Sequence, residues 1–202
     1  SDSLLDNFLV QDSESKVACE TLVTTGLTVL SGEVKTNSYV DVQEVARETI
    51  RKIGYTKSEY KFDADSCGVI SAIHEQSSDI RQGVVEGEGL HKEQGAGDQG
   101  MMFGYATNET TSYIPLELDL SHQILVELSQ IRKTKKEMLY LRPDSKSQVT
   151  IEYNDEHVPV KISSIVISTQ HDDFDTEENM LKRIKDDILN ILMPKVIEKQ
   201  SD

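Results

Sequence analysis

The chain has 202 residues, of which 37% are hydrophobic, so it is long enough for one large domain or two small ones. Its 36 acidic residues outnumber its 21 basic ones, and a formal net charge of -15 disfavours non-specific binding to nucleic acid or to anionic membranes. The sequence shows no signal peptide, no lipidation motif and no apolar run of transmembrane length. It therefore predicts a cytoplasmic protein whose partners include neither nucleic acid nor a membrane.

The first part of the chain alternates between helical and strand periodicity. Apolar residues recur at helical spacing in 1–11, and the regions 16–25 and 27–35 have the pattern of two paired strands around a glycine turn. Residues 41–53 form the clearest predicted helix, because apolar residues line one face and a capping aspartate stands at the start. A short buried strand is predicted at 67–74.

A polar, glycine-rich loop at 81–94 separates this part from a second αβ unit, and long loops of this kind often act as lids. The predicted domains are therefore 1–80 and 95–202. The second unit is predicted to contain, in order, a strand (101–106), a helix (116–133), two strands (148–153 and 158–168) and a helix that Pro194 stops (177–192). Because strands and helices do not alternate strictly, we expect an α+β fold of two related layered units, with mixed or antiparallel sheets and helices on one face.

Two carboxylates interrupt strands that are otherwise apolar. Glu20 follows Val-Ala-Cys, and Glu33 follows Ser-Gly. A carboxylate in such a strand is costly to bury unless it is paired or binds a cation, which suggests a functional role for each. The alternative is ordinary alternation, in which both side chains point to solvent.

The cysteines and histidines give no indication of a zinc site. Cys19 and Cys67 lie in apolar stretches, in no C-x-x-C pair and near no histidine cluster, so we expect two buried free thiols. His74 ends a predicted strand without a second histidine at ligand spacing, and we interpret it as an ordinary strand-end residue.

The stretch 94–110 gathers four glycines around Asp98. A carboxylate fixed among glycines could meet a cation, such as a substrate ammonium group; a structural glycine turn is the alternative. The stretch also matches the dinucleotide fingerprint G-x-G-x-x-G, which requires a strand before it and a helix after it. Here a polar loop precedes it and a strand-like pattern follows, so a dinucleotide site is disfavoured.

A second candidate for chemistry is the sequence Arg-Pro-Asp-Ser-Lys at 142–146. Asp144 and Lys146 are two residues apart, and in extended chain such side chains project to the same face. They could hold a ribose or base edge and a phosphate, or they could make a surface ion pair of little energy. The sequence contains no Walker A motif, no G-x-S-x-G and no H-E-x-x-H, so a covalent nucleophile has no support.

Several motifs together resemble those of S-adenosylmethionine synthetases (methionine adenosyltransferases). They are VACET at 17–21, SGE at 31–33, GAGDQGMMFGYATNET at 95–110, LRPDSKSQVT at 141–150 and ISTQH at 167–171. The resemblance covers essentially the whole chain. It implies part of a three-domain, pseudo-threefold architecture that joins ATP to L-methionine and releases phosphate and pyrophosphate. It also implies Mg²⁺ and K⁺ as cofactors, and a homodimer or tetramer with active sites at the dimer interface.

The resemblance also assigns roles to individual residues. It implies a potassium-site carboxylate (Glu20), methionine contacts (Glu33, Gln76 and Asp98) and ATP contacts (Asp144, Ser145 and Lys146). Asp98 and Lys146 are the implied catalytic residues, with Lys146 near the phosphates. The 81–94 loop is the implied flexible gate.

Three motifs of the family fall outside these residues. A Gly-His-Pro-Asp-Lys motif would precede Ser1, and the Gly-Arg-Lys and Lys-Asp segments would follow Asp202. Because the triphosphate would lack most of its cationic partners and one magnesium ligand, we expect the 202 residues alone to be inactive. The alternative is a non-catalytic regulatory or binding partner that keeps the synthetase fold. An unrelated nucleotide-binding module is disfavoured by the missing phosphate loop.

Overall fold

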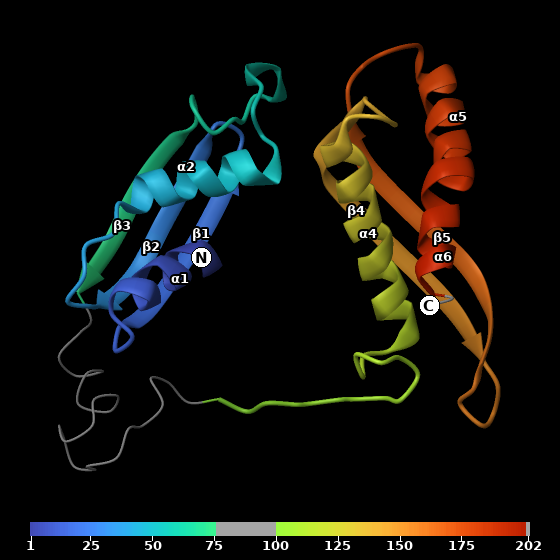
Figure 1. Cartoon of the computed structure of the whole chain (residues 1–202), viewed down its shortest axis with the longest axis horizontal. Helices are drawn as coiled ribbons and strands as arrows, with labels where there is room; N and C mark the ends of the chain where they lie inside the picture. The colour runs from blue at the N-terminus through green and yellow to red at the C-terminus, as the bar shows by residue number, and fades with distance from the viewer. Residues whose placement is uncertain (76–99, 201–202) are drawn as a thin grey trace. The chain divides into compact units, whose positions relative to one another are not determined.

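The computed structural model describes residues 1–75 and 100–200. The chain divides into two compact units, Ser1–Met102 and Phe103–Asp202, which we call unit 1 and unit 2 (Figure 1). Each unit packs helices against its own sheet, and the two are described separately below.

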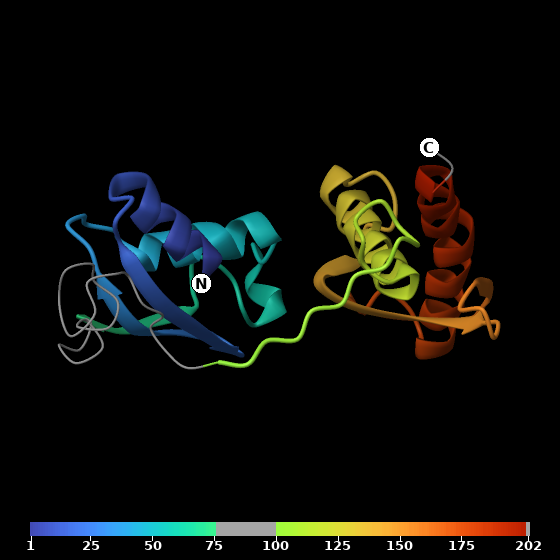
Figure 2. The ribbon, with the colours of Figure 1, turned by 90° about the horizontal axis from the view of Figure 1, so that it is seen from below.

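Unit 1 contains two helices and a three-stranded sheet. Its elements are α1 (Asp2–Gln11), β1 (Lys16–Thr24), β2 (Leu27–Lys35), α2 (Val42–Ile53), a 3₁₀ turn (Ser58–Tyr60) and β3 (Gly68–Glu75). The strand order is β1-β2-β3, with β1 antiparallel and β3 parallel to β2. Both helices lie on one face of the sheet (Figure 2). These elements confirm the strands, the helices and the mixed sheet predicted for this part.

The core of unit 1 lies between the sheet and its two helices. Leu4 and Phe8 of α1 pack with Leu30 and Val34 of β2, and Ala46 of α2 joins this cluster. Ile50, the other buried residue of α2, packs in a smaller cluster that includes Cys67. Helix α2 begins where the Asp41 carboxylate accepts hydrogen bonds from two backbone N–H groups, and it ends at Gly54 in the left-handed conformation, φ 117°. As expected, both cysteines are buried and free.

A buried aspartate organises the turn before β3. Asp63 exposes only 6% of its surface. Its carboxylate accepts from Asp65 N–H at 3.0 Å, from Ser66 N–H at 2.9 Å and from the Ser66 hydroxyl. The Ser66 hydroxyl is the largest cause that lowers the pKa of Asp63, and the Ser66 N–H is the second. Because these donors favour the ionised form, they stabilise the turn most while Asp63 is charged.

We therefore expect the Asp63 turn to make the chain sensitive to acid. A carboxyl group whose pKa is lower in the folded than in the unfolded chain stabilises the fold above its unfolded pKa, about 4. This stability is lost as pH falls through the folded pKa. Thermal melts between pH 7 and pH 2 should show a shallower acid decline for Asp63→Asn than for the parent chain. Asp65→Asn, which removes an exposed charge paired with Arg51, controls for charge loss, and equal slopes for Asp63→Asn and the parent would contradict the prediction.

Unit 2 packs its helices on a two-stranded sheet. Its elements are α4 (Leu116–Thr134), β4 (Leu141–Tyr153), β5 (Pro159–His171), α5 (Glu177–Asp187), a π-helical turn (Ile188–Leu192) and α6 (Met193–Gln200). Strands β4 and β5 are antiparallel. The helices cover one face of this sheet (Figure 2), and the core joins Ile124, Leu128 and Ile131 of α4 to Val149 and Leu192. The α+β fold class predicted from the sequence is confirmed.

Two predictions for unit 2 are wrong. The segment 101–106 is not a strand: it pairs with none of the described strands, and Met101, Met102, Phe103 and Tyr105 are exposed. Its residues suit a pleated surface, but a strand forms only where a neighbour supplies hydrogen bonds. The closing helix also continues beyond Pro194, because a π-helical turn comes first and places this proline in the opening turn of α6, where a missing N–H is tolerated.

Candidate functional site

The two interrupting carboxylates lie on the uncovered face of the sheet in unit 1. Leu30 and Val34 of β2 and Cys19 of β1 point toward the helices and are buried. Side chains alternate along a strand, so Glu20 and Glu33 project from the opposite face. There Glu20 is exposed and Glu33 is half-buried.

The strand register brings these carboxylates close to one another. Glu20 pairs with Ser31, whereas Glu33 pairs with Ala18 on β1 and with His74 on β3. Glu20 and Glu33 are therefore diagonal neighbours on one face. Two negative charges on an open face favour a cation, such as an ammonium group or a metal ion, over an anion. Both side chains thus project from the uncovered face of the sheet, as the solvent-facing alternative predicted. A cation site needs the same arrangement.

Gly32 allows β1 to approach β2 beside Glu33. Its φ of 137° lies in the region that favours glycine, and a Cβ at this position would stand 1.9 Å from the Ala18 carbonyl oxygen. The close backbone contact fixes the pairing that places Glu33 opposite Ala18.

Asp144 and Lys146 meet on β4, as the spacing predicted. The Lys146 Nζ lies 3.4 Å from Asp144 Oδ2, and the two side chains are 78% and 58% exposed. A pair this exposed is worth little, so either member can exchange its partner for a ligand at small cost. Because Ser147 donates to a carbonyl of α4 and Val149 is buried, alternation places Lys146 on the uncovered face of the sheet.

Ser145 does not share the face of its two neighbours. Its hydroxyl contacts Thr169 Oγ1 at 2.9 Å, and the residue lines a recess between α4 and β4. The volume of this recess is about 80 Å³, far below the roughly 300–1,000 Å³ of ordinary ligand pockets. The recess therefore does not hold a nucleotide by itself. The predicted ATP contacts divide into an exposed pair and a half-buried serine behind it.

Unit 1 has a larger cavity at the end of its sheet. Its volume is about 590 Å³, and Phe8, Val34 and Ile73 from the helix-covered side line it together with the loop 35–40. His74, the register partner of Glu33, and Glu75 at the end of β3 also line it. Neither Glu20 nor Glu33 is among its lining residues.

Three of the predicted features lie outside the described residues. They are Gln76, the 81–94 loop and Asp98 with most of its glycine-rich motif. Their roles and the predicted domain boundary stay predictions. Within the described ranges, no three His, Cys, Asp or Glu side chains gather closely enough to hold a metal ion. None of the described helices is long and apolar enough to cross a membrane.

Sequence reasoning missed a half-buried polar cluster in unit 2. The Tyr153 hydroxyl lies 2.9 Å from a carboxylate oxygen of Glu109 and 2.9 Å from one of Glu117. Glu109 belongs to the motif at 95–110 that carries the resemblance to the family, but the resemblance assigned it no role. No sequence pattern pointed to Tyr153 or Glu117, because their contact forms only when β4 packs beside the start of α4.

Comparisons with known proteins identify the family of this two-unit α+β chain. Residues 1–78 match the family model for the S-adenosylmethionine synthetase N-terminal domain, and residues 93–202 match the model for its central domain. The chain belongs to the S-adenosylmethionine synthetase family, which confirms the resemblance found in its motifs.

Curated relatives agree with this assignment. The chain is 64% identical over 202 residues to the S-adenosylmethionine synthase of Flavobacterium johnsoniae, covering 100% of this chain and 48% of the relative. It is 67% identical over 197 residues to that of Christiangramia forsetii, covering 97% and 46%. For that of Cytophaga hutchinsonii the identity is 64% over 199 residues, covering 98% and 47%. The chain thus spans about half the length of the curated relatives it matches.

Proposed function

We propose that the chain forms the N-terminal and central parts of an S-adenosylmethionine synthase that makes S-adenosylmethionine from ATP and L-methionine. The observation that carries this proposal is a match at 64% identity over all 202 residues to a protein of that name. The geometry supports it, because the described carboxylates and the Asp144–Lys146 pair lie on open sheet faces where a ligand can reach them.

The proposed roles follow the chemistry of each side chain. Glu33 and Gln76 contact methionine, Asp98 holds its ammonium group, and Asp144, Ser145 and Lys146 contact ATP. Of the ATP contacts, Lys146 is the cation, so it belongs near the triphosphate. Asp144 is suited to a ribose hydroxyl, since an ionised carboxylate only accepts hydrogen bonds.

The proposed reaction needs no nucleophile from the protein. The methionine sulfur attacks C5′ of the ribose in line, the C5′–O bond breaks, and the triphosphate leaves and is hydrolysed to phosphate and pyrophosphate. The protein must align sulfur, carbon and leaving oxygen, and it must offset the charge that develops on the leaving group. Lys146 supplies part of the positive charge that offsets the charge on the leaving group. Its weak ion pair with Asp144 lets it turn to the triphosphate.

A described side chain suits a K⁺ site, whereas no described residue is assigned to Mg²⁺. Glu20 is an exposed carboxylate opposite Ser31, and such hard oxygen atoms suit K⁺, so Glu20 fits as one ligand of a potassium site. For Mg²⁺ we assign no residue, because the described part of the chain brings no three suitable side chains together.

We propose further that the protein is cytoplasmic and forms a homodimer or tetramer with active sites at the dimer interface. The uncovered sheet faces support this assembly. In unit 2 that face carries apolar Val166, which is 55% exposed, beside Lys146 and Gln148. A second copy would cover such a face and bring its own charged side chains to the site.

A chimera with a complete relative tests the proposed function. The 202 residues would replace the matching segment of the Flavobacterium johnsoniae synthase, a product that we call the chimera. We expect the chimera to form S-adenosylmethionine from ATP and methionine, at a rate within about tenfold of the parent synthase. The 202-residue chain alone should form none, since most cationic partners of the triphosphate are absent from it. Product would be measured by mass spectrometry, together with released phosphate and pyrophosphate.

Two results would contradict this proposal. Product formation by the 202 residues alone would disprove the expectation that this part is inactive. A folded chimera that binds neither ATP nor methionine would favour the alternative function, a non-catalytic regulatory partner of a catalytic subunit. The parent synthase, carried through the same purification, is the control for both.

A further inference from the structure

Strand β4 is irregular where it carries the first of the residues proposed to bind ATP. Two ladder pairs flank the irregular part, Leu141 with His171 and Ser145 with Thr169. Between them, residues 142–144 of β4 lie opposite a single residue of β5, Gln170. Such a β-bulge bends its strand and changes where the next side chains point, and Pro143 suits it because proline has no N–H group for a ladder. The bulge therefore determines where β4 presents Asp144 and, two residues later, Lys146.

The helix beneath this bulge does not pack tightly against it. The recess of about 80 Å³ between α4 and β4 is lined on the strand side by Arg142, Pro143 and Ser145. Atoms beside such a void have no packing partners on that side, so they lose part of the dispersion attraction of a filled core. The position of the bulge thus depends on its hydrogen bonds and ion pairs more than on packing.

Asp172, which follows β5, holds the start of the bulge with two groups. Its N–H donates to the Tyr140 carbonyl at 2.8 Å, and its Oδ1 accepts from Arg142 Nε at 2.7 Å. Asp172 thus contacts the residues on both sides of Leu141. The side chains of Arg142 and Asp172 are only 21% and 34% exposed, so water and salt screen this ion pair less than a fully exposed one. A charge-assisted hydrogen bond of this kind is stronger than a neutral one.

A second link closes the other end of the bulge. Thr169 Oγ1 donates to the Gln170 carbonyl at 3.2 Å, which uses the one proton of this hydroxyl. The Ser145 hydroxyl, 2.9 Å from Thr169 Oγ1, is therefore the donor in that contact. These hydroxyls connect β4 to the residue of β5 that lies opposite the bulge. The backbone is thus fastened at both ends, while the exposed side chains of Asp144 and Lys146 can still exchange partners.

We propose that Asp172 is a positioning residue: by holding Arg142, it fixes the bulge of β4. The bulge in turn sets where Asp144 and Lys146 meet ATP. This effect on activity rests on the proposed function, in which these two side chains contact ATP. Without the ion pair, the backbone at 142–146 samples more positions, and a smaller fraction of molecules is ready to bind ATP. KM for ATP therefore rises, whereas methionine, which other residues contact, keeps its KM.

The first test is Asp172→Asn, which keeps the shape of the side chain and removes its charge. In the 202-residue chain, amide hydrogen exchange in the segment 141–147 should accelerate about tenfold, the usual value of a hydrogen bond to a charged group. In the chimera, KM for ATP should rise about tenfold, while KM for methionine stays within about threefold. A substitution that only reduced the amount of folded enzyme would lower kcat and leave both KM values unchanged.

A second comparison tests whether Asp172 acts through Arg142. In an Arg142→Gln background, Asp172→Asn should change exchange and KM for ATP by no more than about twofold, because the partner of the carboxylate is already lost. Asp172→Glu, which keeps the charge on a longer side chain, should recover most of what Asp172→Asn loses. Additive effects of Arg142→Gln and Asp172→Asn would show that Asp172 acts without Arg142, and they would overturn the proposal.

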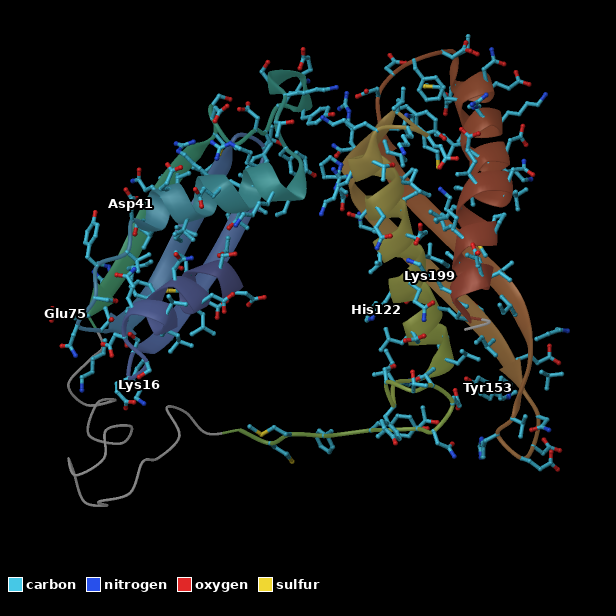
Figure 3. All side chains as sticks on the ribbon, in the orientation of Figure 1. Lys16, Asp41, Glu75, His122, Tyr153 and Lys199 are labelled. Carbon is cyan, nitrogen blue, oxygen red and sulfur yellow. The ribbon has the colours of Figure 1, made fainter. Side chains whose placement is uncertain are left out.

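Glu152→Gln is the matched control. Glu152 also forms an ion pair between β4 and β5, with Lys161 at 2.8 Å, and this variant loses the same charge. It lies beside Tyr153, which Figure 3 labels at the hairpin end of β4, away from the bulge. The control should leave exchange in 141–147 and KM for ATP unchanged. Equal effects of Asp172→Asn and Glu152→Gln on either quantity would overturn the proposal.

The two readouts separate this proposal from the proposed function. If the unsubstituted chimera makes no S-adenosylmethionine, the proposed function fails, and hydrogen exchange alone decides whether Asp172 fixes the bulge. If the chimera is active but Asp172→Asn changes neither exchange in 141–147 nor KM for ATP, or only one of them, the positioning role fails while the function stands. If Asp172→Asn does not fold, Arg142→Gln decides: unchanged exchange in that variant overturns the positioning role.

Discussion

Replacing Lys146 with methionine should lower kcat/KM of the chimera for ATP by about 100-fold to 1,000-fold, the usual cost of removing one preorganised charge at a developing anion. Methionine keeps the length and apolar character of the stem and removes only the charge. The parent side chain is 78% exposed, and its ion pair among the described residues is the one with Asp144 at 3.4 Å, so the fold does not depend on it. The stability of the variant should therefore stay within about 0.5 kcal/mol of the parent.

Lys161 provides the matched control for this substitution. It lies on the partner strand β5, is 62% exposed, and makes a comparable surface ion pair with Glu152 at 2.8 Å. Lys161→Met should leave kcat/KM within about threefold of the parent, since it removes the same charge and the same kind of ion pair from the same sheet. Steady-state kinetics at saturating methionine give both values. Equal losses in Lys146→Met and Lys161→Met would remove Lys146 from the proposed active site.

The elements that the sequence predicted well are those whose signal is local. The helix α2 has a capping aspartate, an apolar face and a glycine stop, and all three lie within or beside the helix itself. The hairpin of β1 and β2 likewise follows from alternation on both sides of one glycine turn. In each case the residues that cause the structure are neighbours in the chain.

The errors occurred where the outcome depends on distant residues. The segment 101–106 has strand-like residues but finds no ladder partner, and a partner cannot be predicted from the segment alone. The helix that was expected to stop at Pro194 continues, because Leu192 and Val196 are both buried in the same core as α4 and the π-helical turn keeps them there. Tertiary packing overrode the local signal at this position.

The candidate site shows the same division. The spacing of Asp144 and Lys146 predicted one shared face, and the ion pair confirms it. By contrast, no sequence pattern predicted the hydrogen bond between Tyr153 and Glu109, a residue 44 positions earlier. Glu109 lies in the motif at 95–110 that resembles the family. Only the packing of β4 beside α4 shows which residues its carboxylate contacts.

Gly32→Ala should strongly destabilise unit 1. The new Cβ would stand 1.9 Å from the Ala18 carbonyl oxygen and 3.2 Å from the Cys19 Cα, and both are backbone atoms that cannot rotate away. Alanine would also be strained at a φ of 137°. Overpacking and backbone strain together should cost roughly 2–5 kcal/mol of unfolding free energy.

The damage from Gly32→Ala should be confined to the strand pair that presents the two carboxylates. Amide hydrogen exchange should show lost protection in β1 and β2, whereas β4 and β5 of unit 2 serve as an internal reference and keep theirs. The control is Gly104→Ala, whose Cβ would meet nothing within 4 Å and which should change stability by no more than about 0.5 kcal/mol. Because the backbone contact at Gly32 sets the pairing of Glu33 with Ala18, the chimera with Gly32→Ala should also bind methionine more weakly. Full protection of β1 and β2 in Gly32→Ala would show that the two strands accommodate the new Cβ and stay paired, and that the close approach is not what holds Glu33 in place.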